Sequence, residues 1–232
     1  MATAKNSSSS AQSRAYESIR NDLLAGVYEP DEKLRIEDIC RRYEIGTIPV
    51  REALSRLAET KLVIAVPQRG YRVATVSAEE YADLVDLRLR LEPEALHRSI
   101  ERGDIDWEAR IAAAYQRLAS ANKSTASGSV DGMRIWAKED RNFHAALISN
   151  CGSPWTLNFC RVVYEQMARY HRSRIREGIV PGSKTGDEHE QLLQAALNRN
   201  ADIATDLLRL HIRRVADRIG TALRQGSIDE PH

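Results

Sequence analysis

Two short runs of β-type residues, 62–66 and 71–76, flank the turn Pro67-Gln68-Arg69-Gly70 in the first third of the chain. Such runs, separated by a turn that contains glycine, predict a β-hairpin. Almost every other segment has the apolar spacing of a helix, so this hairpin is the feature that most restricts the fold. Its turn also carries a cation, Arg69.

Three helical segments precede the hairpin. Residues 14–25 have helical apolar spacing, and Gly26 supplies a stop signal at the C-terminal end. Residues 36–43 form a second short segment, and a third begins at Thr47 with Pro49 in its first turn, where a missing N–H costs nothing. Three helices followed by a hairpin is the order of a winged helix-turn-helix.

The Ser-Ala-Glu-Glu sequence at residues 77–80 is a capping box, and we place a domain boundary at residue 76. Residues 1–13 are polar and serine-rich, so we expect a disordered tail there, with residues 14–76 as the winged unit. Residues 77–232 are expected to be a helical domain that binds an effector and a metal and mediates dimerisation. The predicted fold is mainly α, with an N-terminal winged helix-turn-helix and a C-terminal all-α antiparallel bundle of about six helices. The predicted bundle helices are residues 77–103, 106–121, 131–150, 154–177, 184–199 and 200–225.

The composition excludes some classes of protein. The formal net charge of the 232 residues is +1, which argues against a protein that coats nucleic acid without specificity. A specific DNA binder is compatible with this charge, because its cations can be confined to one helix and one loop. No stretch approaches 18 uninterrupted apolar residues, which predicts no membrane segment. Three cysteines without Cys-x-x-Cys spacing (Cys40, Cys151 and Cys160) indicate free thiols in a reducing cytoplasm.

The helix that begins at Thr47 offers a face suited to DNA contact. Its apolar positions form one stripe and leave Arg51 facing outward. Residues 51–72 contain five basic and two acidic side chains. A helix that reads DNA presents cationic and polar side chains from its first turns. In the alternative interpretation, Arg51 pairs with a nearby carboxylate and Arg69 only solubilises the tip of the hairpin.

Residues 15–74 resemble the DNA-binding domain of GntR-type bacterial regulators. The matching segments are residues 26–30, 33–39, Pro49-Val50-Arg51-Glu52-Ala53-Leu54 and Gln68-Arg69-Gly70-Tyr71-Arg72-Val73. The resemblance implies that Arg35 and Arg51 contact operator DNA and that Arg69 and Gly70 place the wing in the minor groove. Members usually have Ser-Arg-Thr before Pro-Val-Arg, whereas this chain has Gly46-Thr47-Ile48. Thr47 stands where these members have arginine. We include it among the expected DNA contacts, and we expect the operator preference to differ from that of the members with arginine.

Four side chains on three predicted helices have the chemistry of a metal site. Asp140 and His144 lie four residues apart and so share one face of a helix. His189 and His211 lie on the last two predicted helices, and the four could converge inside a bundle. An imidazole-rich set favours zinc or another first-row metal over magnesium or calcium. Taken by itself, the spacing is more often typical of a surface Asp–His pair and of histidines that only form hydrogen bonds.

Residues 79–217 resemble the FadR C-terminal (FCD) effector domain, in its six-helix, VanR-like form. The resemblance is carried by residues 88–92, 140–144, Asp187-Glu188-His189, 200–202 and His211. It implies that Asp140, His144, His189 and His211 bind a divalent metal, with zinc expected first and nickel, manganese or iron as alternatives. It also implies that Arg88 grips an anionic effector, because a planar guanidinium suits a carboxylate.

Two points qualify that resemblance. Arg88 has an alternative role as the partner of Glu92 in a salt bridge one helical turn long. At Ser153 many members have asparagine, so a contact there would alter the choice of effector.

The function that follows is a bacterial transcriptional regulator, most readily a repressor. We expect a cytoplasmic homodimer that binds a palindromic operator and responds to a small organic acid at the metal. One alternative is a metal sensor without an organic effector. Another is a metalloenzyme, in which Glu188 and the histidines activate water. The winged unit argues against an enzyme, and no nucleophile or oxyanion arrangement is evident.

Overall fold

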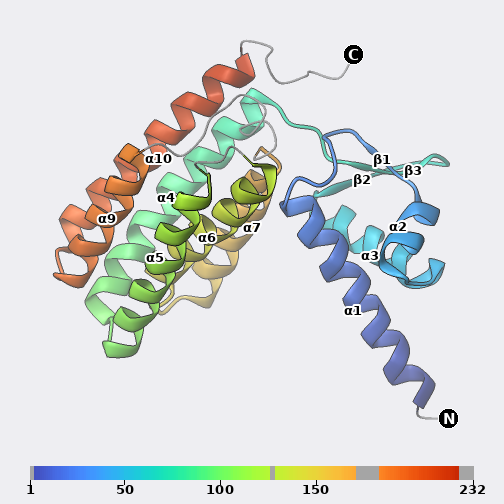
Figure 1. Cartoon of the computed structure of the whole chain (residues 1–232), viewed down its shortest axis with the longest axis horizontal. Coiled ribbons are helices and arrows are strands. Elements are labelled where there is room, and N and C mark those ends of the chain that lie inside the picture. The colour runs from blue at the N-terminus through green and yellow to red at the C-terminus, as the bar shows by residue number, and fades with distance from the viewer. Residues whose placement is uncertain (1–2, 126–128, 171–182, 225–232) are drawn as a thin grey trace. The chain divides into compact units, whose positions relative to one another are not determined.

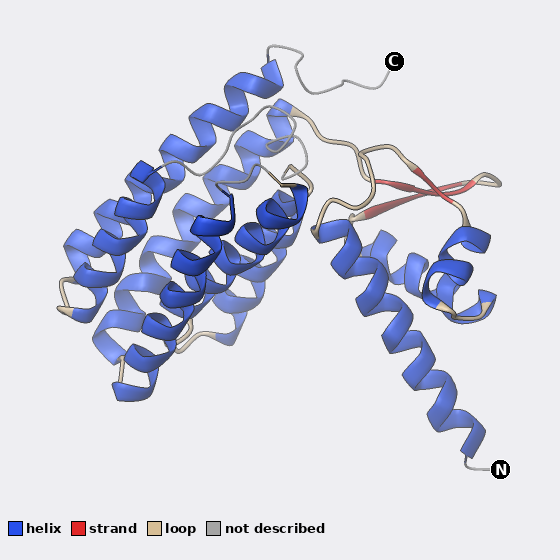
Figure 2. Ribbon diagram, in the orientation of Figure 1, coloured by secondary structure: helices blue, strands red, loops and turns tan. Residues whose placement is uncertain are grey.

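The computed structural model describes residues 3–125, 129–170 and 183–224. It divides into two compact units with the main boundary between Val76 and Ser77, and residues 168–170 group with the first unit. The first unit contains three helices and a small sheet, and the second unit is helical (Figures 1 and 2). The predicted fold class, mainly α with a winged helix-turn-helix and a helical bundle, is confirmed. Within the described residues, no helix is both long enough and apolar enough to cross a membrane.

The first unit follows the predicted order with one extra strand. Its helices are α1 (Thr3–Leu24), α2 (Ile36–Tyr43) and α3 (Thr47–Glu59), and its strands are β1 (Lys33–Leu34), β2 (Val63–Val66) and β3 (Gly70–Val73). The strand order is β1-β3-β2, and both pairs are antiparallel. Arg72 of the central strand β3 pairs with Lys33 of β1 on one side and with Ile64 of β2 on the other. A strand of two residues is too short to show an alternating pattern, which is why β1 was not predicted.

The prediction of a disordered tail over residues 1–13 differs from the structure, where α1 begins at Thr3. The chain has no glycine or proline between Thr3 and Leu24, so nothing interrupts a helix that grows back from the packed part of α1. Serine is only a moderate helix former, and it was the run of four serines that indicated a tail.

The core of the first unit holds the helix-turn-helix in place. Ile19 of α1, Leu54 and Leu57 of α3 and Leu62 before β2 are fully buried and belong to one apolar cluster. Glu44 takes a left-handed conformation, with φ of 54°, in the turn between α2 and α3. These contacts fix the orientation of α3, whose apolar stripe faces the core as predicted.

Six helices of the second unit lie within the described residues. They are α4 (Ala78–Arg102), α5 (Ile105–Thr125), α6 (Val130–Ile148), α7 (Pro154–Ala168), α9 (Ser183–Leu197) and α10 (Ala201–Arg224). The Ser77 hydroxyl caps α4 by accepting from the Glu80 N–H at 3.1 Å, as the capping box predicted. The end of the predicted helix 154–177 and part of the predicted loop 123–132 fall outside the described residues.

The helices of this unit pack around an aromatic and aliphatic core. Helix α4 packs against α10 and α6, and α5 packs against α6 and α9 (Figure 1). Trp107, Trp136 and Phe143 are among the largest fully buried side chains. This packing brings α6, α9 and α10 together although they are far apart in sequence.

Candidate functional site

Three buried histidines meet inside the second unit. His144 comes from α6, His189 from α9 and His211 from α10, and their exposed fractions are 1%, 0% and 5%. One ring nitrogen of each lies within 4.8 Å of the corresponding nitrogens of the other two. We call these three residues the histidine cluster. The structure therefore brings together three of the four residues expected to bind a metal.

Asp140, the fourth expected ligand, lies beside the histidine cluster. Its Oδ1 is 3.3 Å from His189 Nε2, and its side chain is 18% exposed. Among the described residues, no hydrogen-bond partner satisfies Asp140 Oδ1, His144 Nε2 or either ring nitrogen of His189. Buried polar atoms without partners cost free energy, and a bound cation would supply a partner for Asp140 Oδ1, His144 Nε2 and one ring nitrogen of His189. These donors fit a metal that favours imidazole and carboxylate ligands.

The protonation states also suit a metal. Burial lowers the pKa of His144 well below its ordinary value, and the positive charge of Arg88 lowers it further. Burial by itself raises the pKa of Asp140, but the neighbouring imidazoles lower it by more, so this pKa lies below the usual carboxyl range. A neutral imidazole and an ionised carboxylate are the forms that bind metal ions.

Arg88 forms the salt bridge that was the alternative to effector binding. Its Nε lies 2.5 Å from Glu92 Oε1, and both side chains are buried. The guanidinium also lies over the ring of Tyr164, 4.9 Å from its centroid. Burial by itself lowers the pKa of Arg88, but the charge of Glu92 raises it by more, so the guanidinium stays ionised. The ring centroid of the same Tyr164 is 6.3 Å from that of His144, so this tyrosine neighbours both Arg88 and the histidine cluster.

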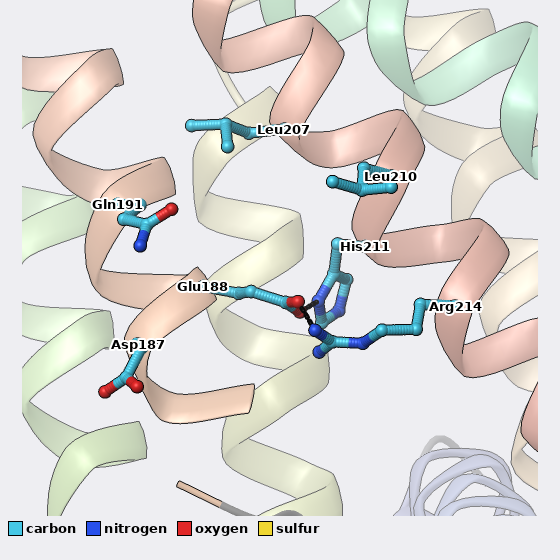
Figure 3. Close-up of a pocket in the computed structure, with 7 residues that line it drawn as sticks. All are labelled: Asp187, Glu188, Gln191, Leu207, Leu210, His211 and Arg214. Atoms are coloured by element: carbon cyan, nitrogen blue, oxygen red, sulfur yellow. Dashed lines mark hydrogen bonds and ion pairs between the residues drawn. The ribbon is translucent and has the colours of Figure 1, made fainter. Parts of the chain in front are cut away.

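A cavity of about 230 Å³ is lined by residues of α9 and α10, and His211 forms part of its wall (Figure 3). Glu188 lies at this wall, and its Oε2 is 2.9 Å from His211 Nδ1. Arg214 forms an ion pair with the same carboxylate. The sequence placed Glu188 next to a histidine but gave no sign of these partners, because they come from a different helix.

Ser153 has a local role. Its hydroxyl accepts from the Thr156 N–H at 3.2 Å and so caps α7, which begins at Pro154. An asparagine could cap the helix in the same way, so either residue suits the start of α7.

The expected DNA-contacting residues are all exposed. Arg35 precedes α2, Thr47 and Arg51 lie in the first turns of α3, and Arg69 and Gly70 lie at the tip of the β2–β3 hairpin. Within residues 3–125, 129–170 and 183–224, none of the three arginines forms an ion pair. The alternative in which Arg51 pairs with a carboxylate therefore has no support. Gly70 has φ of +91°, a conformation that most side chains avoid, so glycine suits the tight turn of the hairpin.

The other two arginines of this region have structural partners. Arg56 lies over the ring of Tyr16, 4.3 Å from its centroid, and Arg72 Nη1 is 3.1 Å from Asp31 Oδ2. The five basic residues counted in the sequence therefore divide into a group that holds the unit together and a group that faces solvent.

Known families match both units. The family of bacterial regulatory proteins called gntR matches residues 11–73, and the FCD domain matches residues 83–214. The HTH-type transcriptional regulator BphR of Paraburkholderia xenovorans is 39% identical over 197 residues, which cover 85% of this chain and 80% of that protein. The HTH-type transcriptional repressor GlaR of Escherichia coli is 34% identical over 200 residues, which cover 85% of this chain and 90% of that protein.

Solved structures have the same fold. A putative GntR regulator from Rhodococcus sp. RHA1 superposes with a TM-score of 0.78 at 22% identity, covering 92% of this chain and 99% of that one. E. coli McbR/YncC superposes with a TM-score of 0.77 at 17% identity, covering 91% of this chain and 97% of that one. Matches that span both units show that the two units occur together in one architecture.

Proposed function

This chain belongs to the gntR family of bacterial transcriptional regulators and carries an FCD effector domain, and from that premise we propose that it is a repressor controlled by a small carboxylate bound beside a metal. The observation that carries the proposal is the histidine cluster with its unsatisfied donor atoms, next to a buried arginine. The family matches and the named relatives are regulators, so the chain is not an enzyme.

The winged unit would bind operator DNA. Arg51 and Thr47 project from the first turns of α3, where recognition helices contact base edges, and Arg69 with Gly70 would enter the minor groove. A second copy of the chain would read the other half of a palindromic operator, because the symmetry of the site mirrors that of a dimer. The protein would work in the cytoplasm, where the chromosome is.

The metal would be held by His144, His189 and His211, with Asp140 as the fourth ligand. Zinc is the first expectation, with nickel, manganese or iron as alternatives, since imidazole suits each of them. When bound, the ion would supply a positive centre that attracts the carboxylate of an effector. The chain's own part is to bury the ligands, keep His144 neutral and keep Asp140 ionised.

Arg88 would be the second anchor for the effector. Its Nε already donates a hydrogen bond to Glu92 Oε1. This bond orients the planar guanidinium, and the carboxylate compensates its buried charge. An incoming carboxylate would interact with this oriented cation and shift the arrangement of the helices that carry the site. The affinities for effector and DNA would then be coupled reciprocally.

Repression relieved by the effector is the favoured direction, since one similar protein is named a transcriptional repressor. A metal sensor without an organic effector is the second candidate. The buried Arg88 favours an organic anion, because sensing a cation requires no positive side chain beside the site.

The test is fluorescence anisotropy with DNA from the region upstream of the protein's own gene. The protein would be zinc-loaded and titrated with a panel of small carboxylic acids. We expect tight, salt-sensitive binding that one class of acid weakens. A response to zinc alone, unchanged by every acid, would replace the proposal with the metal sensor. Failure of the metal-loaded protein to bind any of this DNA would refute the operator assignment.

A further inference from the structure

His211 is held from the side by a carboxylate that no prediction assigned to it. Glu188, on α9, places Oε2 at 2.9 Å from Nδ1 of His211, on α10. The exposed fractions of the two side chains are 17% and 6%, so the contact is largely shielded from water. A carboxylate can only accept here, so the proton of the neutral ring must lie on Nδ1.

This contact determines which atom of His211 can bind a metal. With Nδ1 donating to Glu188, the electron pair for a metal lies on Nε2, and the ring cannot rotate without breaking the bond. The ring centroid of His211 is 4.7 Å from that of His189 and 5.2 Å from that of His144. The bond to Glu188 thus fixes both the tautomer and the direction of one member of the histidine cluster.

Glu188 is itself held in place. Arg214, one turn after His211 on α10, forms an ion pair with the Glu188 carboxylate. Figure 3 shows Glu188 extending from α9 toward these two residues of α10. The pair lies in the wall of the cavity lined by both helices. A cation on one side and an imidazole on the other leave the carboxylate little freedom to move away.

We infer that Glu188 is a positioning residue of the metal site, a role that rests on the proposed function. It would not bind the metal itself, but it holds the proton of His211 on Nδ1, which leaves the ring's electron pair on Nε2 and makes the ring a stronger donor. Removing such a partner typically lowers metal affinity by about 10- to 100-fold. Arg214 would keep the Glu188 carboxylate in contact with His211 Nδ1.

The test compares Glu188→Ala and Glu188→Gln with the control Glu190→Gln, an exposed position on the same helix. Zinc affinity would be measured by competition with a chelator, and the visible spectrum of the cobalt-substituted protein would report the ligand geometry. We expect alanine to weaken zinc binding by about 10- to 100-fold and to change the cobalt spectrum. Glutamine, whose amide oxygen still accepts, should have a smaller effect, and Glu190→Gln should have none.

A second readout needs no metal. Nitrogen-15 NMR of the imidazoles in the metal-free protein should show His211 in the Nδ1–H form, and Glu188→Ala should turn it into a mixture. This comparison holds even if zinc affinity changes through an effect on folding. Equal zinc affinity and an unchanged tautomer in Glu188→Ala would overturn the inference while leaving the metal site intact. A wild-type protein that binds no metal would instead overturn the metal site itself, and the positioning role with it.

Discussion

At the scale of single residues, the buried polar groups of the second unit are the most informative. His144, His189 and Asp140 have buried atoms without hydrogen bonds, whereas Arg88 and Glu92 form an ion pair in which Arg88 Nε donates to Glu92 Oε1 and Glu92 Oε2 has no hydrogen-bond partner among the described residues. A bound cation would supply partners to the first group, whereas the charges of Arg88 and Glu92 already compensate each other. The two groups should therefore respond differently to substitution.

Loss of a histidine should abolish stabilisation by zinc. Zinc at 100 times its dissociation constant would stabilise the wild-type protein by about 2.7 kcal/mol, seen as a rise in Tm. In His144→Ala we expect this rise to disappear, because the buried Nε2 that faces the cluster is lost. His97→Ala, a partly exposed histidine of α4, is the control and should keep the full rise. A zinc response that survives in His144→Ala would contradict the site.

The Arg88–Glu92 pair should behave as a unit in stability measurements. Arg88→Met should destabilise the protein by about 3–5 kcal/mol, because it leaves the buried Glu92 carboxylate without its partner. The double variant Arg88→Met/Glu92→Leu should recover most of this loss, since an apolar pair carries no charge to bury. Urea unfolding measures both. If Arg88 binds the effector, the double variant will fold yet ignore the acid in the DNA-binding assay.

At the scale of secondary-structure elements, α3 carries the recognition chemistry. Arg51→Ala should weaken operator binding by about 1–3 kcal/mol without changing the stability of the protein, because the side chain is exposed. Arg56→Ala is the matched comparison from the same helix. It should cost about 0.5–1 kcal/mol of stability through loss of the contact with Tyr16. Similar effects of both variants on stability and on DNA affinity would show that α3 is not oriented as described.

The cap of α4 gives a second test at this scale. Ser77→Ala should destabilise the second unit by about 1 kcal/mol, because the Glu80 N–H loses its acceptor. Ser120→Ala, at an exposed position inside α5, should have little effect or stabilise slightly, since alanine is the better helix former. Thermal unfolding of the two variants separates these cases.

Elements with strong local signals could be predicted from the sequence. Periodicity, the capping box and Pro49 located the helices, and the turn at Gly70 located the hairpin. The strand β1 and the early start of α1 could not be predicted, because one depends on pairing with β3 and the other on helix growth through serines. The convergence of three histidines was implied by resemblance, while the contact of Glu188 with His211 depends on how α9 packs on α10.

At the scale of the whole molecule, the proposal requires two copies on one operator. Light scattering should give twice the mass of the chain, and a footprint should show two half-sites centred about one helical turn of DNA apart, or a multiple of that. Affinity should fall steeply with salt, because phosphate contacts release counterions. A monomer that protects a single half-site would contradict the dimeric arrangement.

The positions of the histidines along the chain have a consequence for its topology. An ion bound by His144, His189 and His211 would be a cross-link that closes two successive loops, one from α6 to α9 and one from α9 to α10. Unlike a disulfide, such a cross-link exists only where the three helices are packed, so the bound ion stabilises the folded state and couples the opening of these helices. Chelation would open both loops at once, so amide exchange in α9 and α10 should quicken together rather than one after the other.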